Sequence, residues 1–150
     1  MKSLNTNTNN VKWNYTRTNY IKYFPTLFND LNHDKGEVHL SHIELFHYSQ
    51  RQIIKAFEIM NKNQGCYYII YSSFIDRANA LSKKIKWSKN IALYTQIGEN
   101  DLEQINELKS CKAKTKFIEI DRELILKHPE YQLTVLHMDY FPFDPLVMIA

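Results

Sequence analysis

Apolar and polar positions alternate between two periods along the chain from Glu37 onward. Unbroken or alternating apolar runs, which are typical of β-strands, occupy residues 38–46, 66–71, 91–97, 116–121 and 132–138. In the first run the apolar phase changes between Leu40 and Ile43, which predicts a bulge or a strand buried on both faces. The run at 66–71 has no polar residue in alternation, as expected of a central strand that is covered on both sides.

Helical spacing fills the intervals between these runs. Ile53, Phe57 and Met60 follow one another at i, i+4 and i+7, which predicts a helix over residues 49–62, with Gly65 as its stop. A second helix is expected over residues 75–86. A third is expected to begin at Asn100, which can cap an acidic first turn.

The order of these elements predicts the fold class. Strands that alternate with helices indicate an α/β domain with a mainly parallel sheet and helices on both faces, a three-layer sandwich. We assign this domain to residues 37–150 and treat residues 1–36 as an N-terminal extension.

The extension combines a polar start with an aromatic second half. Its first twenty residues are rich in Asn and Thr, which favour turns over helix or strand. The aromatic residues that follow suggest a docking arm, and we predict that the arm binds a partner through Trp13, Tyr15, Tyr20, Tyr23, Phe24 and Phe28. Folding back over its own domain and stacking on nucleic-acid bases are the alternatives.

Composition limits the classes of function without choosing one. The 150 residues carry a net charge of +3, which is too small to identify a nucleic-acid binder by charge alone. Two cysteines outside any C-x-x-C pair indicate a reducing compartment. The polar N-terminus lacks the apolar core of a secretory signal, and no apolar run approaches the length of a membrane span. We therefore expect a soluble, cytoplasmic protein with no membrane association.

Several local motifs occur in an order known from helicases. Residues 69–74, Ile-Ile-Tyr-Ser-Ser-Phe, form an apolar strand that ends in small polar residues, and a helix starting Asp-Arg-Ala-Asn follows. Residues 116–121 and 134–145 provide two further strand-and-turn segments. This succession resembles the second RecA-like lobe of superfamily 2 helicases, the helicase C-terminal domain, over residues 37–150.

The resemblance implies contacts to a nucleic-acid backbone and a lobe without catalytic parts. The family contacts the sugar–phosphate backbone at positions that match Ser72, Ser73, Arg77, Asp121 and Arg122. No glycine follows Asp121, no arginine follows Arg122, and the glycines at 36, 65 and 98 cannot form a G-x-x-x-x-G-K-[ST] loop. We therefore expect no ATPase activity, no enzyme activity and no cofactor.

Two lysine clusters add to this prediction. Residues 77–89 hold Arg77 and four lysines with no acid, and a second cluster contains Lys109, Lys112, Lys114 and Lys116. Lysines of this kind bind phosphates, although a solvated helix face explains them as well. The predicted nucleic-acid-binding residues are Ser72, Ser73, Arg77, Lys83, Lys84 and Arg122.

Other candidate sites are weaker. His39, His42 and His47 do not complete a recognisable metal-ligand set, so no metal is predicted. Neither Cys66 nor Cys111 has a visible base, and no catalytic residue is assigned.

The resulting hypothesis is a non-catalytic accessory subunit of a nucleic-acid machine, with a protein partner in a larger complex and DNA or RNA as a further partner. The alternative is a protein–protein interaction module of a virus, phage or plasmid with no nucleic-acid role. An enzyme of unrecognised type is a third reading.

Overall fold

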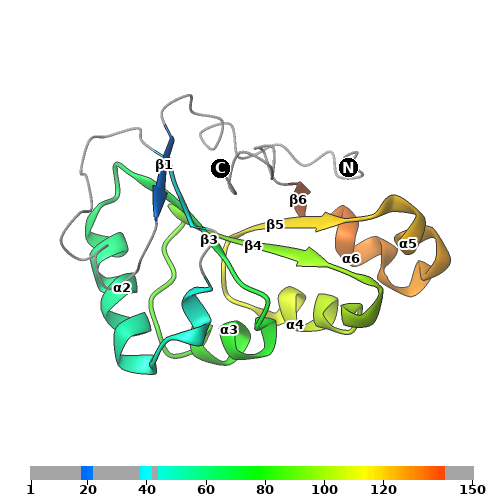
Figure 1. Ribbon diagram of the computed structural model, residues 1–150, viewed down its shortest axis with the longest axis horizontal. Helices are drawn as coiled ribbons and strands as arrows, with labels where there is room; N and C mark the ends of the chain where they lie inside the picture. The colour runs from blue at the N-terminus through cyan, green and yellow to red at the C-terminus, as the bar shows by residue number, and fades with distance from the viewer. Residues whose placement is uncertain (1–17, 22–37, 42–43, 141–150) are drawn as a thin grey trace.

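A parallel β-sheet forms the centre of the domain in the computed structural model, which describes residues 18–21, 38–41 and 44–140 (Figure 1). Its six strands lie in the order β1-β2-β3-β4-β5-β6, and every neighbouring pair is parallel. The strands are β1 (Thr18–Ile21), β2 (Val38–Ser41), β3 (Tyr67–Tyr71), β4 (Ile91–Ile97), β5 (Thr115–Ile120) and β6 (Asp139–Tyr140).

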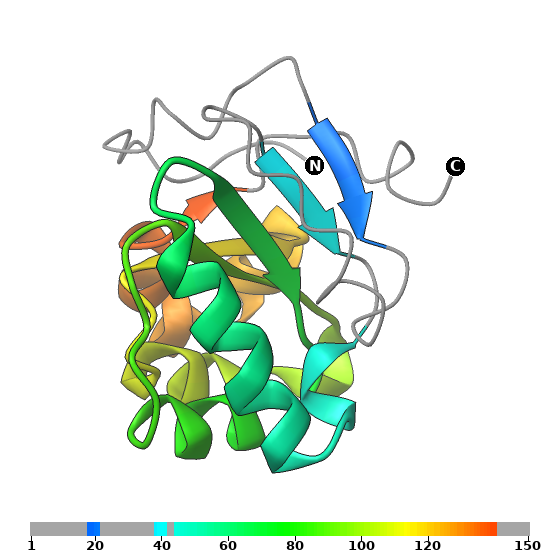
Figure 2. The same ribbon diagram turned by 90° about the vertical axis from the view of Figure 1, so that its left-hand side faces the viewer.

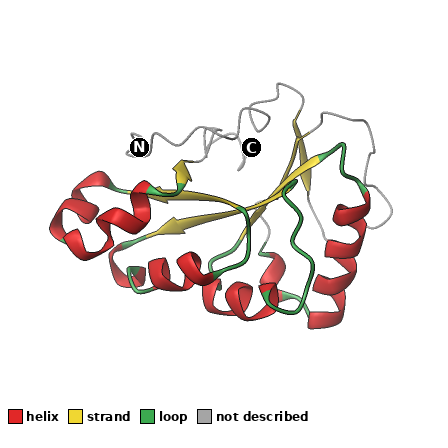
Figure 3. Cartoon of the chain, turned by 180° about the vertical axis from the view of Figure 1, so that it is seen from behind, coloured by secondary structure: helices red, strands yellow, loops and turns green. Residues whose placement is uncertain are grey.

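The described helices all lie on one side of this sheet (Figures 1, 2 and 3). A strictly sequential strand order explains the arrangement, because right-handed crossovers that advance in one direction place each helix on the same face. The α-helices are α2 (Gln50–Lys62), α3 (Ile75–Ser82), α4 (Gln104–Ser110), α5 (Arg122–Lys127) and α6 (Gln132–Leu136). Short 3-10 helices are η2 (Leu45–His47), η3 (Glu99–Asp101) and η4 (Pro129–Tyr131).

The strands bury side chains on both faces. On the helix side, Tyr68 and Ile70 of β3 join a large core with residues of every described α-helix. On the opposite face, Ile69 and Tyr94 belong to a second buried cluster made of strand residues. The predicted α/β class with a parallel sheet and packed helices is confirmed. The described helices cover one face of the sheet, so the described residues provide two of the three predicted layers.

Three predicted elements are confirmed closely. Helix α2 begins after Ser49, whose hydroxyl accepts a hydrogen bond from the Gln52 amide while the Gln52 side chain bonds back to the Ser49 amide, a complete capping box. Strands β3 and β4 occupy the two apolar runs that predicted them.

Four details of the prediction are wrong. The run at 38–46 is a strand only as far as Ser41, and η2 follows at Leu45. Helix α3 ends at Ser82 rather than at residue 86, and Asn100 lies inside η3 instead of capping α4. Helix α2 ends at Lys62 with Asn63 as its C-cap, before Gly65 is reached.

The largest error concerns residues 132–138, which we predicted as a strand. Gln132–Leu136 is helix α6, and the strand that follows is the two-residue β6. The apolar residues of this segment alternate weakly, and only Val135 of α6 is buried in the core. Tertiary contact of one helical face has overridden the strand propensity of Val and Thr.

The N-terminal extension is described in one short segment. Residues Thr18–Ile21 form β1 and pair with β2, so Tyr20 lies opposite Leu40 in the sheet. The other predicted docking residues, Trp13, Tyr15, Tyr23, Phe24 and Phe28, lie outside the described residues. Among the helices of the described segments, none has the length and apolar character needed to cross a membrane.

Candidate nucleic-acid interface

Three of the four described connections that lead from a helix into a strand carry lysines and meet at one edge of the sheet. The fourth, residues 137–138 before β6, carries no lysine and is followed by Asp139. Because each helix runs back antiparallel to the parallel strands, every helix-to-strand connection returns to the edge where the strands begin. The connections into β3, β4 and β5 are residues 63–66, 83–90 and 111–114. Together with the adjoining ends of α2, α3 and α4 and the first two residues of β5, they make up residues 61–66, 82–90 and 109–116. We call these three segments together the basic edge.

The basic edge concentrates positive charge. Its segments contain one, four and four lysines, nine in all, with no Asp, Glu or Arg. Eight of the nine lysines are exposed, and the ninth, Lys116, is half-buried. The set is Lys62, Lys83, Lys84, Lys86, Lys89, Lys109, Lys112, Lys114 and Lys116.

Hydrogen bonds hold the three segments against each other. The Lys112 amide donates to the Ser82 hydroxyl at 3.0 Å, which ties the third segment to the second. The Asn61 side-chain amide donates to the Lys86 carbonyl at 2.9 Å, which ties the first segment to the second. The two lysine clusters of the sequence are therefore one surface.

Asn90 provides the strongest of these ties. Its buried side-chain nitrogen lies 3.1–3.2 Å from three carbonyl oxygens, those of Met60, Asn63 and Cys66. These carbonyls belong to the end of α2 and the turn into β3, where the Met60 and Asn63 carbonyls also accept hydrogen bonds from the amides of Asn63 and Cys66 at 3.2 and 3.0 Å. The Asn90 nitrogen adds a donor that the three carbonyls share. The backbone of the basic edge is thus fixed by a side chain that points inward, and its lysines are left to point outward.

Trp87 anchors the middle of the second segment in the core. Its ring lies 4.7 Å from that of Phe57 and 6.1 Å from that of Phe46, and its indole nitrogen donates to the Ile91 carbonyl at 2.8 Å. Burial of this one large side chain holds the flanking lysines at the surface on both sides of it.

Lys116 differs from the other lysines of the basic edge. Its ammonium donates to the Lys109 carbonyl at 3.1 Å, at the end of α4. Partial burial lowers the pKa of this ammonium, because removal from water disfavours the charged form. Lys116 therefore contributes to the structure of the edge more than to its outer surface.

The opposite edge of the sheet, where the strands end, is rich in acids. Its acidic residues are Glu44, Asp76, Glu99, Asp101, Glu103, Asp121 and Glu123. This separation has a structural cause, since helices on one face of a parallel sheet all point the same way. Acids near their N-termini and lysines near their C-termini both complement the helix dipole.

The predicted nucleic-acid-binding residues are divided between these two edges. Lys83 and Lys84 lie on the basic edge directly after α3 and are exposed. Ser72, Ser73, Arg77 and Arg122 follow the ends of β3 and β5, at the acidic edge. The structure therefore does not bring the six predicted residues together.

The two serines at the acidic edge are engaged within the protein. Ser72 is buried, and its hydroxyl accepts a hydrogen bond from the Phe74 amide at 3.0 Å. Ser73 is exposed, and both its amide and its hydroxyl donate to one carboxylate oxygen of Glu44.

The two arginines differ in how they are held. The Arg77 guanidinium donates to the Phe46 carbonyl at 2.7 Å and so braces η2 against α3. Arg122 is exposed at the first position of α5. Among the described residues, Arg122 has no bond of this kind to a backbone carbonyl. Its guanidinium is therefore more accessible at the surface than that of Arg77.

The sequence analysis identified eight of the nine lysines, but it did not predict that the two clusters lie on one surface. The lone Lys62, at the end of α2, was overlooked because no other lysine stands near it in the chain. The signal that could have found it is topological: in a predicted parallel sheet, every helix-to-strand connection reaches the same edge.

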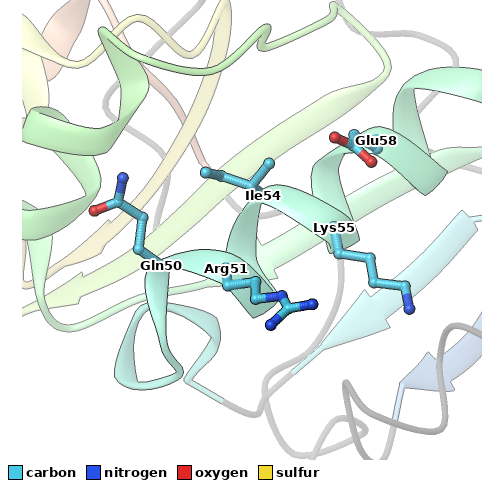
Figure 4. A pocket seen from close by; sticks show the side chains of 5 residues that line it. All are labelled: Gln50, Arg51, Ile54, Lys55 and Glu58. Atoms are coloured by element: carbon cyan, nitrogen blue, oxygen red, sulfur yellow. The ribbon is translucent and has the colours of Figure 1, made fainter.

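A hollow of about 500 Å³ lies elsewhere, along the outer face of α2 (Figure 4). Among the described residues, Gln50, Arg51, Ile54, Lys55 and Glu58 line it. Arg51 and Lys55 extend in the same direction from neighbouring turns of the helix. The hollow carries both signs of charge and does not indicate one ligand chemistry.

Residues considered for other chemistry stay apart in the structure. Within the described segments, no three His, Cys, Asp or Glu side chains gather as a metal site requires. His47 stacks on Phe74 with ring centres 6.0 Å apart, and both cysteines are buried as free thiols.

Searches of protein-family models, curated proteins and solved structures found no match to this chain. The resemblance to a helicase lobe stays a prediction from the motifs. In open parallel sheets, ligands bind where the strand order reverses. The described strands contain no such reversal.

Proposed function

We propose that this domain is a non-catalytic accessory subunit of a nucleic-acid machine and that it binds the phosphate backbone through the basic edge. The observation that carries the proposal is the convergence of nine lysines from three separate segments, without an acid among them. The buried free thiols of Cys66 and Cys111 support a reducing location such as the cytoplasm.

Lysine side chains suit this task physically. Each exposed ammonium is a point charge on a flexible stem that can reach a phosphate oxygen. Each phosphate that a lysine neutralises releases condensed counterions, so affinity falls steeply with salt. The helix dipole explains one or two lysines in the last turn of a helix. Four lysines in one segment are more than the dipole explains.

Fluorescence anisotropy with a labelled DNA duplex tests the proposal. The test variant is Lys84→Gln with Lys112→Gln, which removes two exposed charges from adjacent segments of the basic edge. We expect the logarithmic salt slope to fall by about 2 and the affinity at about 50 mM salt to fall about tenfold or more.

The matched control removes two charges elsewhere. Arg51→Gln with Lys127→Gln changes two exposed residues, in α2 and α5, outside the basic edge, and gives the same net charge. We expect the control to bind as the unchanged protein does. Equal losses in both variants would show that net charge alone attracts the duplex, and the absence of any binding at low salt would refute the proposal.

A second candidate function rests on a different surface. Leu126 of α5 and Leu133 of α6 are 60% and 69% exposed, and Leu136 is 38% exposed one turn beyond Leu133. Exposed leucines on two successive short helices favour a protein interface. If a stoichiometric protein partner co-purifies with the chain and is lost in Leu133→Asp, while duplex binding is absent, the interaction-module function is the correct one.

A further inference from the structure

The basic edge lacks the side chains that read bases. Arginine, which recognises guanine through two parallel hydrogen bonds, is absent from its three segments. Trp87 is the only aromatic residue in these segments, and it is 5% exposed and packed against Phe57. Tyr67, which follows the first segment as the first residue of β3, is half-buried and packs against the second buried cluster of strand residues. The three segments themselves leave no exposed ring on which a base could stack.

The amide side chains of the basic edge are also occupied. Asn, like Gln, can read adenine through its amide group. Here the side-chain nitrogens of Asn61, Asn63, Gln64 and Asn90 each donate to a backbone carbonyl of the protein. These four are all the Asn and Gln residues of the three segments. Their amides stabilise the turns and are not directed at a ligand.

The strand entries of the basic edge cover a short distance across the sheet. Neighbouring strands of a sheet lie about 4.8 Å apart, so the entries to β3, β4 and β5 span about 10 Å. Proteins that bind single strands without sequence preference combine a groove that follows the backbone with stacking aromatics, each worth about 1–3 kcal/mol per base. The basic edge offers neither among the described residues.

We infer that the basic edge binds double-stranded nucleic acid through phosphates alone, without sequence preference and in preference to single strands. This inference rests on the proposed function and adds the class of nucleic acid. A duplex presents one charge per about 1.7 Å of its axis, which is a higher charge density than that of a single strand. Lysines that bind phosphates without stacking on bases should therefore have a higher affinity for the duplex.

Competition anisotropy separates the possible ligands. A labelled DNA duplex is bound to the full chain and displaced by unlabelled duplexes of unrelated sequence, or by one of their single strands at equal nucleotide concentration. We expect the duplexes to compete within about threefold of one another and the single strand to compete about tenfold less well.

A substitution makes the absence of stacking testable. Lys84→Trp adds an aromatic side chain at an exposed position of the basic edge. We expect this variant to gain affinity for the single strand relative to the duplex, by about fivefold or more. Lys84→Gln is its control, because it loses the same charge without gaining a ring.

The outcomes distinguish the two claims. A single strand that competes as well as the duplex, or one duplex sequence preferred about tenfold or more over another, overturns this inference and leaves the proposed function intact. If neither duplex nor single strand binds at about 50 mM salt, the proposed function itself fails.

Discussion

The backbone amide of Lys112 donates a hydrogen bond of 3.0 Å to the hydroxyl of Ser82, and this bond joins segments that lie 30 residues apart in the chain. The same hydroxyl donates to the Asn79 carbonyl at 2.7 Å, in the last turn of α3. One buried serine thus connects the end of a helix to the neighbouring lysine cluster.

Ser82→Ala is therefore expected to lower the free energy of unfolding by about 1–2 kcal/mol, since it leaves the Lys112 amide without its partner. Urea denaturation followed by circular dichroism measures the change. Ser110→Ala is the control, because that exposed hydroxyl accounts for a single bond of 3.3 Å to the Asn106 carbonyl. Equal losses in the two variants would mean that the Ser82 bond is not important for the edge.

Asn90→Ala is expected to be more severe. Removal of this side chain leaves the carbonyls of Met60, Asn63 and Cys66 without the donor that they share, and we expect a loss of about 3 kcal/mol. Asn61→Ala removes one bond at a more exposed position and should cost about 1 kcal/mol or less. Thermal denaturation of the two variants compares them directly, and a smaller effect at Asn90 than at Asn61 would contradict the assignment.

The Glu44 carboxylate clamps two loops at the acidic edge. One of its oxygens accepts from the Phe46 amide at 3.0 Å, and the other accepts from the amide and the hydroxyl of Ser73. A double-mutant cycle with Glu44→Gln and Ser73→Ala should give a coupling free energy of about 0.5–3 kcal/mol. The same Ser73→Ala variant should bind the DNA duplex unchanged. A weaker duplex interaction would favour the contact that the helicase resemblance implies.

The stability of the protein should depend on pH through Tyr94 under alkaline conditions. Burial raises the pKa of this phenol, and the adjacent Glu119 carboxylate, which accepts its hydrogen bond at 2.8 Å, raises it further. An unfolded tyrosine ionises near pH 10, so above about that pH the unfolded chain loses a proton that the folded protein retains. The stabilising effect of the neutral phenol is complete below about pH 10 and declines as the pH rises.

Tyr94→Phe tests this dependence. At about pH 8 the variant lacks one hydrogen bond and should be less stable by about 1 kcal/mol. Above about pH 10 the difference from the unchanged protein should shrink, because phenylalanine has no proton to lose. Urea denaturation at both pH values measures the difference, with Tyr131→Phe as the control for loss of a tyrosine. A difference that stays constant with pH would contradict the role of Tyr94.

Periodicity found the elements that are well buried or well capped. Strand β4 was predicted with its observed bounds because four apolar residues open the segment, Ile97 closes it, and Asn90 and Gly98 flank it. Helix α2 was predicted from the apolar stripe of Ile53, Phe57 and Met60, and the structure adds a capping box of Ser49 and Gln52 at its start. The failure at α6 has the opposite cause, since one buried residue does not produce a periodic signal.

The candidate site was predicted in pieces. Clusters of lysines can be recognised in a sequence, and both clusters were interpreted as possible phosphate contacts. The helicase motifs added Ser72, Ser73, Arg77 and Arg122, which the structure places at the other edge of the sheet. No local pattern reports which edge a residue reaches, because the edge depends on the direction in which each connection crosses the sheet.

The sequence by itself determined the α/β class, the alternation of strands with helices and the amount of charge in each connection, because these follow from local periodicity and composition. Only the tertiary structure decided that the strands lie in sequential order with the described helices on one face. That order points those helices the same way, and it gathers the lysines of three connections and of the adjoining helix and strand ends at one edge of the sheet. Contacts such as Lys112 with Ser82 join residues far apart in the chain, so they exist only after the sheet has formed.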